Sequence, residues 1–175
     1  PLSLRRAHEI AAVLRAVAPG NLDVVDFLAR LDRADDAQEA NRLGEDALNA
    51  GKLGVDGGPD DALTHFRNAQ ALRPGDMRAN QGIAAVESAL IRRAELAADR
   101  DDYAAAQREL DVAAKVRPAA DTVEDARARL AMQRIVRVNA LRDAGLAALS
   151  RQGGMDEARR HLAHVATGDR HHRQS

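Results

Sequence analysis

The chain has 175 residues and a formal net charge of −1, and only 2% of its residues are aromatic. Because alanine and leucine are strong helix formers, this composition favours an all-helical chain over a sheet protein. The absence of cysteine excludes disulfides, thiolate zinc sites and cysteine nucleophiles, and no apolar run approaches the roughly 18 residues that span a bilayer, so we expect no membrane span in this segment.

The first predicted helix covers residues 7–19, where Ala7, Ala11 and Leu14 follow helical spacing and Pro19 ends the pattern. Because the sequence starts at Pro1 and not at a methionine, we expect a processed product or a segment of a longer protein. The sequence LGEDAL at 43–48 marks a second helix. It is followed by GKLGVDGGPDD at 51–61, a predicted loop whose Pro59 is expected to open the next helix.

Short and long helical patterns alternate through the rest of the chain. The short ones cover residues 62–74, 101–118 and 158–165, and two of them end in a proline. The long ones cover Asp76 to Arg100 and Asp121 to Ser150, where no proline interrupts, and they predict helices of roughly 25–30 residues. Asp121 with Glu124 fits a capping box. We therefore expect about seven helices and a flexible tail at 169–175.

The short helices share one template, which places a small residue, a bulky residue and another small residue on one face. Residues 43–48, 93–98 and 144–149 carry a second motif, in which Gly44, Ala94 or Gly145 lies three positions before an alanine. A helix of the second kind, a turn and a helix of the first kind form an antiparallel hairpin. Hairpins that cannot bury their apolar faces alone stack on one another.

The closest fit to this pattern is given by seven residues: Ala94, Ala97, Tyr103, Ala106, Leu110, Ala113 and Pro118. On these residues the chain resembles the tetratricopeptide repeat (TPR) family over roughly residues 3–166. The resemblance implies an all-α, TPR-like array of antiparallel helical hairpins, an α-solenoid, over residues 1–168. The family period is about 34 residues, whereas the closing prolines here lie 55 and 44 residues apart, so the units are longer.

The glycine-rich insert, the segment Ala71–Asp76 and the long helix that follows are also similar to accessory helical regions of large bacterial signalling or formylglycine-generating-enzyme-like proteins. This second resemblance implies an interaction or sensory module in the bacterial cytoplasm or periplasm, with any catalysis in another part of the protein.

In the TPR family the first helix of each pair lines a concave groove that holds peptides. Carried over by the small-residue motif, the resemblance implies a groove made of Gln38, Asn41, Glu45, Asn49, Ser88, Ile91, Glu95, Asp99, Asn139, Arg142 and Ser150. Such a groove is polar, and asparagine offers a peptide backbone both a donor and an acceptor. The alternative is that these side chains only face solvent.

The charges are unevenly distributed along the chain. Residues 1–125 contain 16 basic and 23 acidic side chains, whereas residues 126–175 contain 10 and 4. The first part therefore carries −7 and the second +6. This asymmetry favours an acidic partner at the C-terminal part or head-to-tail alignment of copies, although solvated helix faces give the same pattern without any partner.

Aspartate pairs and histidines are the candidates for chemistry. The pairs at 60–61 and 101–102 precede predicted helices, where carboxylates cap free amides, and hard-cation binding is the alternative. His161, His164, His171 and His172 leave zinc or nickel binding open, but no cysteine joins them and the last two lie in the expected tail. We predict no catalytic residue, cofactor or metal.

Nucleic-acid binding is not predicted either. The basic stripe Arg127, Arg134 and Arg137 lacks interleaved stacking aromatics, and GVDGGPDD lacks the lysine and the serine or threonine of a phosphate-binding loop. The sequence therefore predicts a non-enzymatic scaffold that binds a protein or peptide through its polar groove or its charged ends. The alternatives are a self-associating, homo-oligomeric helical array and a sensory or accessory domain of a larger bacterial signalling protein.

Overall fold

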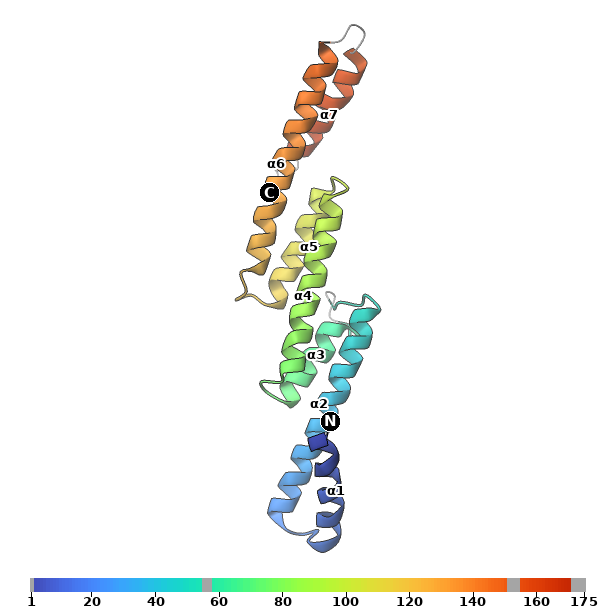
Figure 1. Ribbon diagram of the computed structural model, residues 1–175, viewed down its shortest axis with the longest axis vertical. Helices are drawn as coiled ribbons and strands as arrows, with labels where there is room; N and C mark the ends of the chain where they lie inside the picture. The colour runs from blue at the N-terminus through green and yellow to red at the C-terminus, as the bar shows by residue number, and fades with distance from the viewer. Residues whose placement is uncertain (1, 55–57, 151–154, 171–175) are drawn as a thin grey trace. The chain divides into compact units, whose positions relative to one another are not determined.

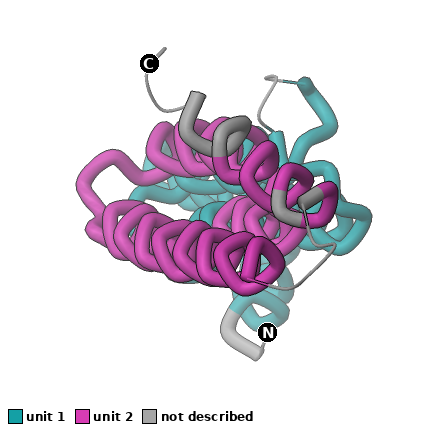
Figure 2. Tube along the Cα trace, turned by 90° about the horizontal axis from the view of Figure 1, so that it is seen from above, with its two compact units in different colours: residues 1–89 teal, residues 90–175 magenta. Residues whose placement is uncertain are grey.

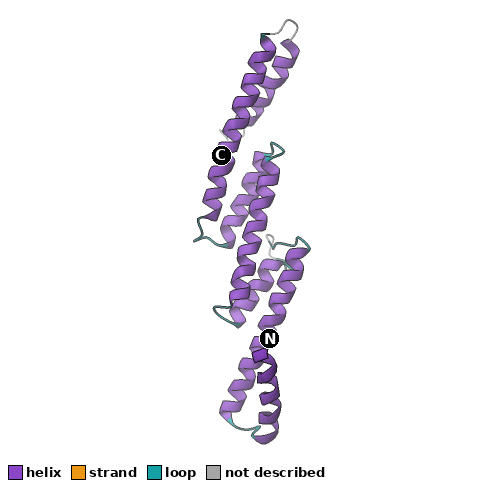
Figure 3. Cartoon of the chain, in the orientation of Figure 1, coloured by secondary structure: helices purple, strands orange, loops and turns teal. Residues whose placement is uncertain are grey.

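The computed structural model describes residues 2–54, 58–150 and 155–170, and these residues form seven helices and no strand (Figures 1 and 3). The helices are α1 (Leu2–Val17), α2 (Leu22–Asn49), α3 (Ala62–Leu72), α4 (Met77–Ala98), α5 (Tyr103–Val116), α6 (Thr122–Leu149) and α7 (Met155–Arg170). The described part of the chain is therefore all-α, which confirms the prediction from composition. None of these helices is both long and apolar enough to cross a bilayer.

The chain divides into two compact units, residues 1–89 and residues 90–175 (Figure 2). The boundary falls inside α4, so the first part of this helix belongs to unit 1 and its last part to unit 2. In unit 1, α2 packs against both α1 and α3, and in unit 2, α6 packs against both α5 and α7. Each of these long helices is therefore shared between two short ones.

The observed helix lengths confirm the prediction for α6 and differ from those expected for α4 and α2. α6 has 28 residues, within the expected range, whereas α4 has 22 and stops at Ala98, before the turn that precedes α5. α2 also has 28 residues, although the sequence motif marked only its last part. α7 continues past Gly168 to Arg170. The expected tail beyond this point, including His171 and His172, lies outside the described residues.

Proline and aspartate explain where the short helices end and begin. Pro19, Pro74 and Pro118 each stand two residues after the last residue of a helix, as predicted. Asp102 caps α5, because its carboxylate accepts a hydrogen bond of 2.9 Å from the Ala105 backbone N–H.

Two expected helix starts form differently. Pro59 does not open α3, since it lies in a turn and α3 begins at Ala62. α6 does begin after Asp121, but the Asp121 side chain makes no capping hydrogen bond, so the capping-box bond is absent. Glu124 instead accepts a hydrogen bond of 2.5 Å from Arg127.

The core of unit 1 is built on very close helix approaches. Phe66 of α3 is 0% exposed. A Cβ added at Gly44 of α2 would lie 2.7 Å from its ring, and one added at Gly82 of α4 would lie 2.3 Å from it. The two glycines therefore accommodate the ring, and not another small residue. Small residues do meet one another nearby, in the buried alanine cluster Ala40, Ala69 and Ala79.

The core of unit 2 uses the predicted template residues. Ala106, Leu110 and Ala113 of α5 are all at most 2% exposed, which confirms the face predicted from their spacing. Against them α6 contributes its own buried residues, Val123, Ala126 and Leu130. Further along α6, a Cβ added at Gly145 would lie 3.4 Å from the Cβ of His161, which is an ordinary contact distance.

Candidate functional site

Most of the polar residues predicted to line a peptide groove contact other parts of the chain. In unit 1, Asn41 is 2% exposed, and its Nδ2 donates a hydrogen bond of 3.2 Å to Asp76 Oδ1. That carboxylate also accepts a hydrogen bond from the Ala79 backbone N–H. Asn41 therefore does not face an open groove, because its amide joins α2 to the start of α4.

Glu45 has a similar role one turn further along α2. Arg78 of α4 donates two hydrogen bonds to its carboxylate, at 2.5 and 2.6 Å. These donors hold the pKa of Glu45 below its usual value. Gln38 and Asn49 are exposed on the same helix and the Glu45 side chain is 42% exposed, so Asn41 alone of the four predicted α2 residues is buried.

In unit 2, Glu95 of α4 and Asp99, in the turn directly after α4, accept hydrogen bonds from α6. Arg129 donates to Glu95 at 3.1 Å, and the Gln133 amide donates to Asp99 at 2.8 Å. Ile91 on the same helix is half-buried. The structure therefore brings Glu95 and Asp99 together, but as a contact between helices.

The remaining predicted residues are dispersed. Ser88 and Ser150 donate to backbone carbonyl oxygens of their own helices, at 2.9 and 2.8 Å. Arg142 pairs with the adjacent Asp143, at 2.9 Å. Asn139 is exposed and lines a groove between α5 and α6, away from the other predicted α6 residues.

These contacts between successive long helices recur at nearly constant sequence separation. The pairs are 35 and 33 residues apart in unit 1, at Asn41–Asp76 and Glu45–Arg78. In unit 2 the separations are 34, 34 and 36, at Glu95–Arg129, Asp99–Gln133 and Asp101–Arg137. In both units, therefore, these polar contacts join residues that are 33 to 36 positions apart, although the closing prolines are spaced differently.

Each unit contains a hollow near the predicted site residues. The one in unit 1, of about 970 Å³, lies beside Gln38 and Asn41 and has four arginines among its lining residues. Three of them have a carboxylate nearby: Arg30 pairs with Asp26, Arg78 pairs with Glu45, and Arg73 Nη1 lies 3.9 Å from Asp76. Its positive charge is therefore largely compensated within the chain.

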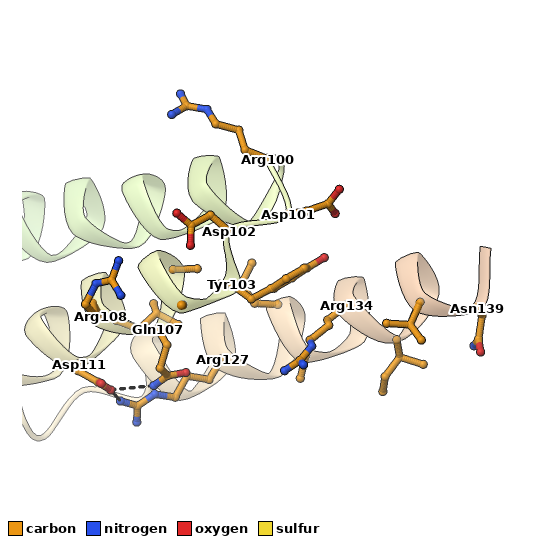
Figure 4. Close-up of a pocket in the computed structure, with 17 residues that line it drawn as sticks. Arg100, Asp101, Asp102, Tyr103, Gln107, Arg108, Asp111, Arg127, Arg134 and Asn139 are labelled. Atoms are coloured by element: carbon orange, nitrogen blue, oxygen red, sulfur yellow. Dashed lines mark hydrogen bonds and ion pairs between the residues drawn. The ribbon is translucent and has the colours of Figure 1, made fainter. Parts of the chain in front are cut away.

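The hollow in unit 2 has a volume of about 1040 Å³ and lies between α5 and α6 (Figure 4). We call it the α5–α6 groove. Its lining residues are Arg100 to Ala104, Ala106 to Arg108, Leu110, Asp111, Arg127, Leu130, Ala131, Arg134, Ile135, Val138 and Asn139. The floor is apolar, and polar groups stand along the sides.

Tyr103 forms the centre of this groove. The guanidinium of Arg134 lies over its ring, 5.7 Å from the centroid, which is within the range of a cation–π contact. Burial and the nearby Asp101 carboxylate raise the pKa of the Tyr103 hydroxyl. The ring therefore offers a neutral, flat apolar surface whose position is fixed by a charged neighbour (Figure 4).

The turn before Tyr103 is held to α6 by Asp101. Its carboxylate accepts hydrogen bonds from Arg137, at 3.0 and 2.8 Å. Asp101 also has a φ of +62°, a left-handed conformation that aspartate tolerates better than most residues. This fork of hydrogen bonds fixes the turn and, with it, the start of α5.

The sequence analysis missed an exposed apolar surface beside the groove. Met132, Ile135 and Val136 of α6 are 62%, 53% and 65% exposed. They are separated by three and four residues, so they share one face of α6. This spacing is visible in the sequence, but spacing alone does not show whether an apolar face of a helix is covered by a neighbour.

The histidines and aspartates give no metal-binding cluster within the described residues, where no three candidate ligands come together. His8 Nε2 lies 3.0 Å from Asp35 Oδ1, between α1 and α2. His161 lies 4.0 Å from Glu157, one turn away on α7. These two histidines therefore have carboxylate neighbours that are structural contacts.

The chain matches no family model, and comparisons with curated proteins and with solved structures find no match.

Proposed function

We propose that this chain is a non-enzymatic, TPR-like interaction scaffold, and that it binds a protein or peptide segment in the α5–α6 groove. The observation that carries the proposal is the groove itself, in which an apolar floor is bordered by arginines beside the exposed residues Met132, Ile135 and Val136. An exposed apolar patch of this kind on a folded chain is typical of interaction sites.

The repeated helix contacts support the TPR-like part of the proposal. Polar pairs between successive long helices are separated by 33 to 36 residues in both units, close to the family period of about 34 residues. Asn41, Glu45, Glu95 and Asp99, which the resemblance assigned to a peptide groove, are used in these contacts. We therefore assign partner binding to the surface of α5 and α6 instead.

A peptide partner suits this groove because its polar groups include both hydrogen-bond donors and acceptors, and its apolar groups are side chains that present flat or branched surfaces. Peptide recognition generally combines backbone or side-chain hydrogen bonds with pockets for a few apolar anchors. An accessory or sensory domain of a larger bacterial signalling protein would use such a groove in the same way.

Self-association is a second candidate, favoured by the charges of −7 and +6 on residues 1–125 and 126–175. α1 also exposes an apolar stripe of its own, made of Ile10, Val13 and Val17. If copies associate through opposite charges, light scattering will show a larger mass at low salt that decreases as salt screens the charges. A mass that does not change with salt excludes charge-driven assembly.

Site-specific photo-crosslinking in cells tests the scaffold proposal. A photoreactive amino acid at Ile135 is expected to give discrete adducts with another protein. The same amino acid at Arg92, an exposed α4 residue of unit 2 that does not line the groove, serves as the matched control. Equal labelling from both positions, or adducts only with copies of this chain, contradicts the proposal.

A further inference from the structure

We propose that the segment bound in the α5–α6 groove is acidic and amphipathic, with carboxylates that contact Arg100 and Arg108 and an apolar side chain that packs on Tyr103 and Ile135. This inference rests on the proposed function, since it names the chemistry of the partner that the groove receives.

The charge argument begins with the aspartates that line the groove. Asp101 is held by Arg137, and Asp102 caps the Ala105 backbone N–H. Asp111 accepts hydrogen bonds from Arg127, at 2.7 Å, and from Gln107, at 2.8 Å (Figure 4). Asp101 and Asp111 are therefore paired with arginines, whereas Asp102 keeps its charge, because its donor is a neutral backbone N–H. The lining carries four arginines against these three aspartates.

The arginines that line the groove are not all compensated in this way. Arg127 is paired with Asp111 and Glu124. By contrast, neither Arg100 nor Arg108 forms an ion pair or side-chain hydrogen bond with any residue that the structure describes. The guanidinium groups of Arg100 and Arg108 thus line the groove without a hydrogen-bond acceptor in the described part of the chain. Arginine forks bind carboxylates with two parallel hydrogen bonds.

The apolar part of the site lies next to these donors. Tyr103 is half-buried under the Arg134 guanidinium, and Ile135 is 53% exposed. Covering these side chains removes apolar surface from water and supplies affinity, while the charges govern the rate of encounter and the choice of partner. A basic segment lacks the charge attraction to the arginines, and a uniformly polar segment lacks the burial of apolar surface.

Helix geometry limits how one segment can reach both groups. Tyr103 and Arg108 are five residues apart on α5, which places them about 7.5 Å apart along the helix axis and about 140° apart around it. A bound segment must therefore cross α5 to contact both, and we expect its acidic and apolar residues to be near one another without a fixed spacing.

Selection from a random peptide library displayed on phage tests the inference with the full-length chain as bait. The expected consensus combines Asp or Glu with a large apolar residue nearby in the peptide. For the selected peptides, the R100A/R108A double variant is expected to weaken binding about tenfold. Added salt weakens binding to the unmodified chain, and R100K/R108K is expected to keep only part of the affinity, because lysine retains the charge but cannot form two parallel hydrogen bonds.

Arg92→Ala is the matched control, since Arg92 is an exposed arginine of the same unit outside the groove. Its affinity is expected to equal that of the unmodified chain, and circular dichroism checks that all variants fold. A neutral or basic consensus whose binding depends on Tyr103 and Ile135 overturns the acidic partner but not the scaffold function. Failure to select any peptide that depends on Tyr103 and Ile135 overturns both.

Discussion

Replacing Gly82 by alanine tests the closest helix approach in the chain. The added Cβ would lie 2.3, 2.4 and 2.5 Å from Cε1, Cδ1 and Cζ of Phe66, whereas carbon atoms in contact prefer about 3.5–4.0 Å. The ring must therefore move by about 1 Å. It cannot do so freely, because a shift away from Gly82 is limited by Gly44, whose own added Cβ would lie 2.7 Å from the same ring.

Two opposing contributions set the size of the effect. Overpacking of a well-filled core costs about 1–3 kcal/mol. Replacing glycine by alanine inside a helix returns about 1 kcal/mol through helix propensity. Because the ring must move by about 1 Å, we take the upper end of the overpacking cost, about 2–3 kcal/mol, and therefore expect Gly82→Ala to lower the free energy of unfolding by about 1–2 kcal/mol. Urea denaturation followed by far-ultraviolet circular dichroism measures this change as a lower midpoint.

A double-mutant cycle identifies the cause. If the clash with the ring is responsible, Phe66→Leu will cost less stability in the Gly82→Ala background than in the unmodified chain, with a coupling of about 1 kcal/mol. Gly145→Ala is the control, because its added Cβ would lie at an ordinary 3.4 Å from His161, and it should be neutral or slightly stabilising. Unchanged or increased stability of Gly82→Ala, or additive effects with Phe66→Leu, would refute the reasoning.

Three further predictions concern polar contacts. The Arg78 hydrogen bonds lower the pKa of Glu45, so this pair stabilises the fold above the ordinary glutamate pKa of about 4.3 and ceases to do so as pH falls through the lower folded-state pKa. Urea midpoints between pH 7 and pH 3 should therefore fall more for the unmodified chain than for Glu45→Gln. Asp102→Ala should cost about 1 kcal/mol of unfolding free energy, because its side chain caps α5, whereas Asp121→Ala should cost almost nothing, because it makes no such bond. Asn41→Ala should cost about 1–2 kcal/mol in the same urea assay, since it removes a buried hydrogen bond.

Each of these has an outcome that contradicts it. Parallel pH profiles for the unmodified chain and Glu45→Gln would show that the ion pair does not contribute to stability. Equal losses for the two aspartate variants would show that the Asp102 cap is not the cause. An Asn41 variant as stable as the unmodified chain would mean that its amide contact to α4 has no net value.

Sequence reasoning succeeded where the relevant forces act between near neighbours. The ends of α1, α3 and α5 followed from Pro19, Pro74 and Pro118, because proline removes a backbone donor and clashes with the preceding turn. The buried face of α5 followed from helical spacing. Both effects span a few residues and need no knowledge of the partner helix.

The site could not be predicted in the same way. Asn41 and Glu45 looked like surface residues of α2, but residues 35 and 33 positions further along the chain fold back to meet them. Conversely, the α5–α6 groove depends on how α6 passes α5, which leaves Ile135 and its neighbours exposed. No local pattern distinguishes a polar side chain that faces a partner from one that faces another helix.

By itself, then, the sequence determined that the described part of the chain is helical, where the helices before Pro19, Pro74 and Pro118 end, and which faces of α3 and α5 are buried. The template face of α7 is not buried in the same way, since Leu162 is 44% exposed. The tertiary structure decided which polar groups are used within the chain and which remain available, as Arg100 and Arg108 do. The physical reason is the distance along the chain over which each interaction acts. Helix propensity and capping act within a few residues of the chain, whereas hydrogen bonds and packing between helices depend on approach distances that only the assembled fold fixes.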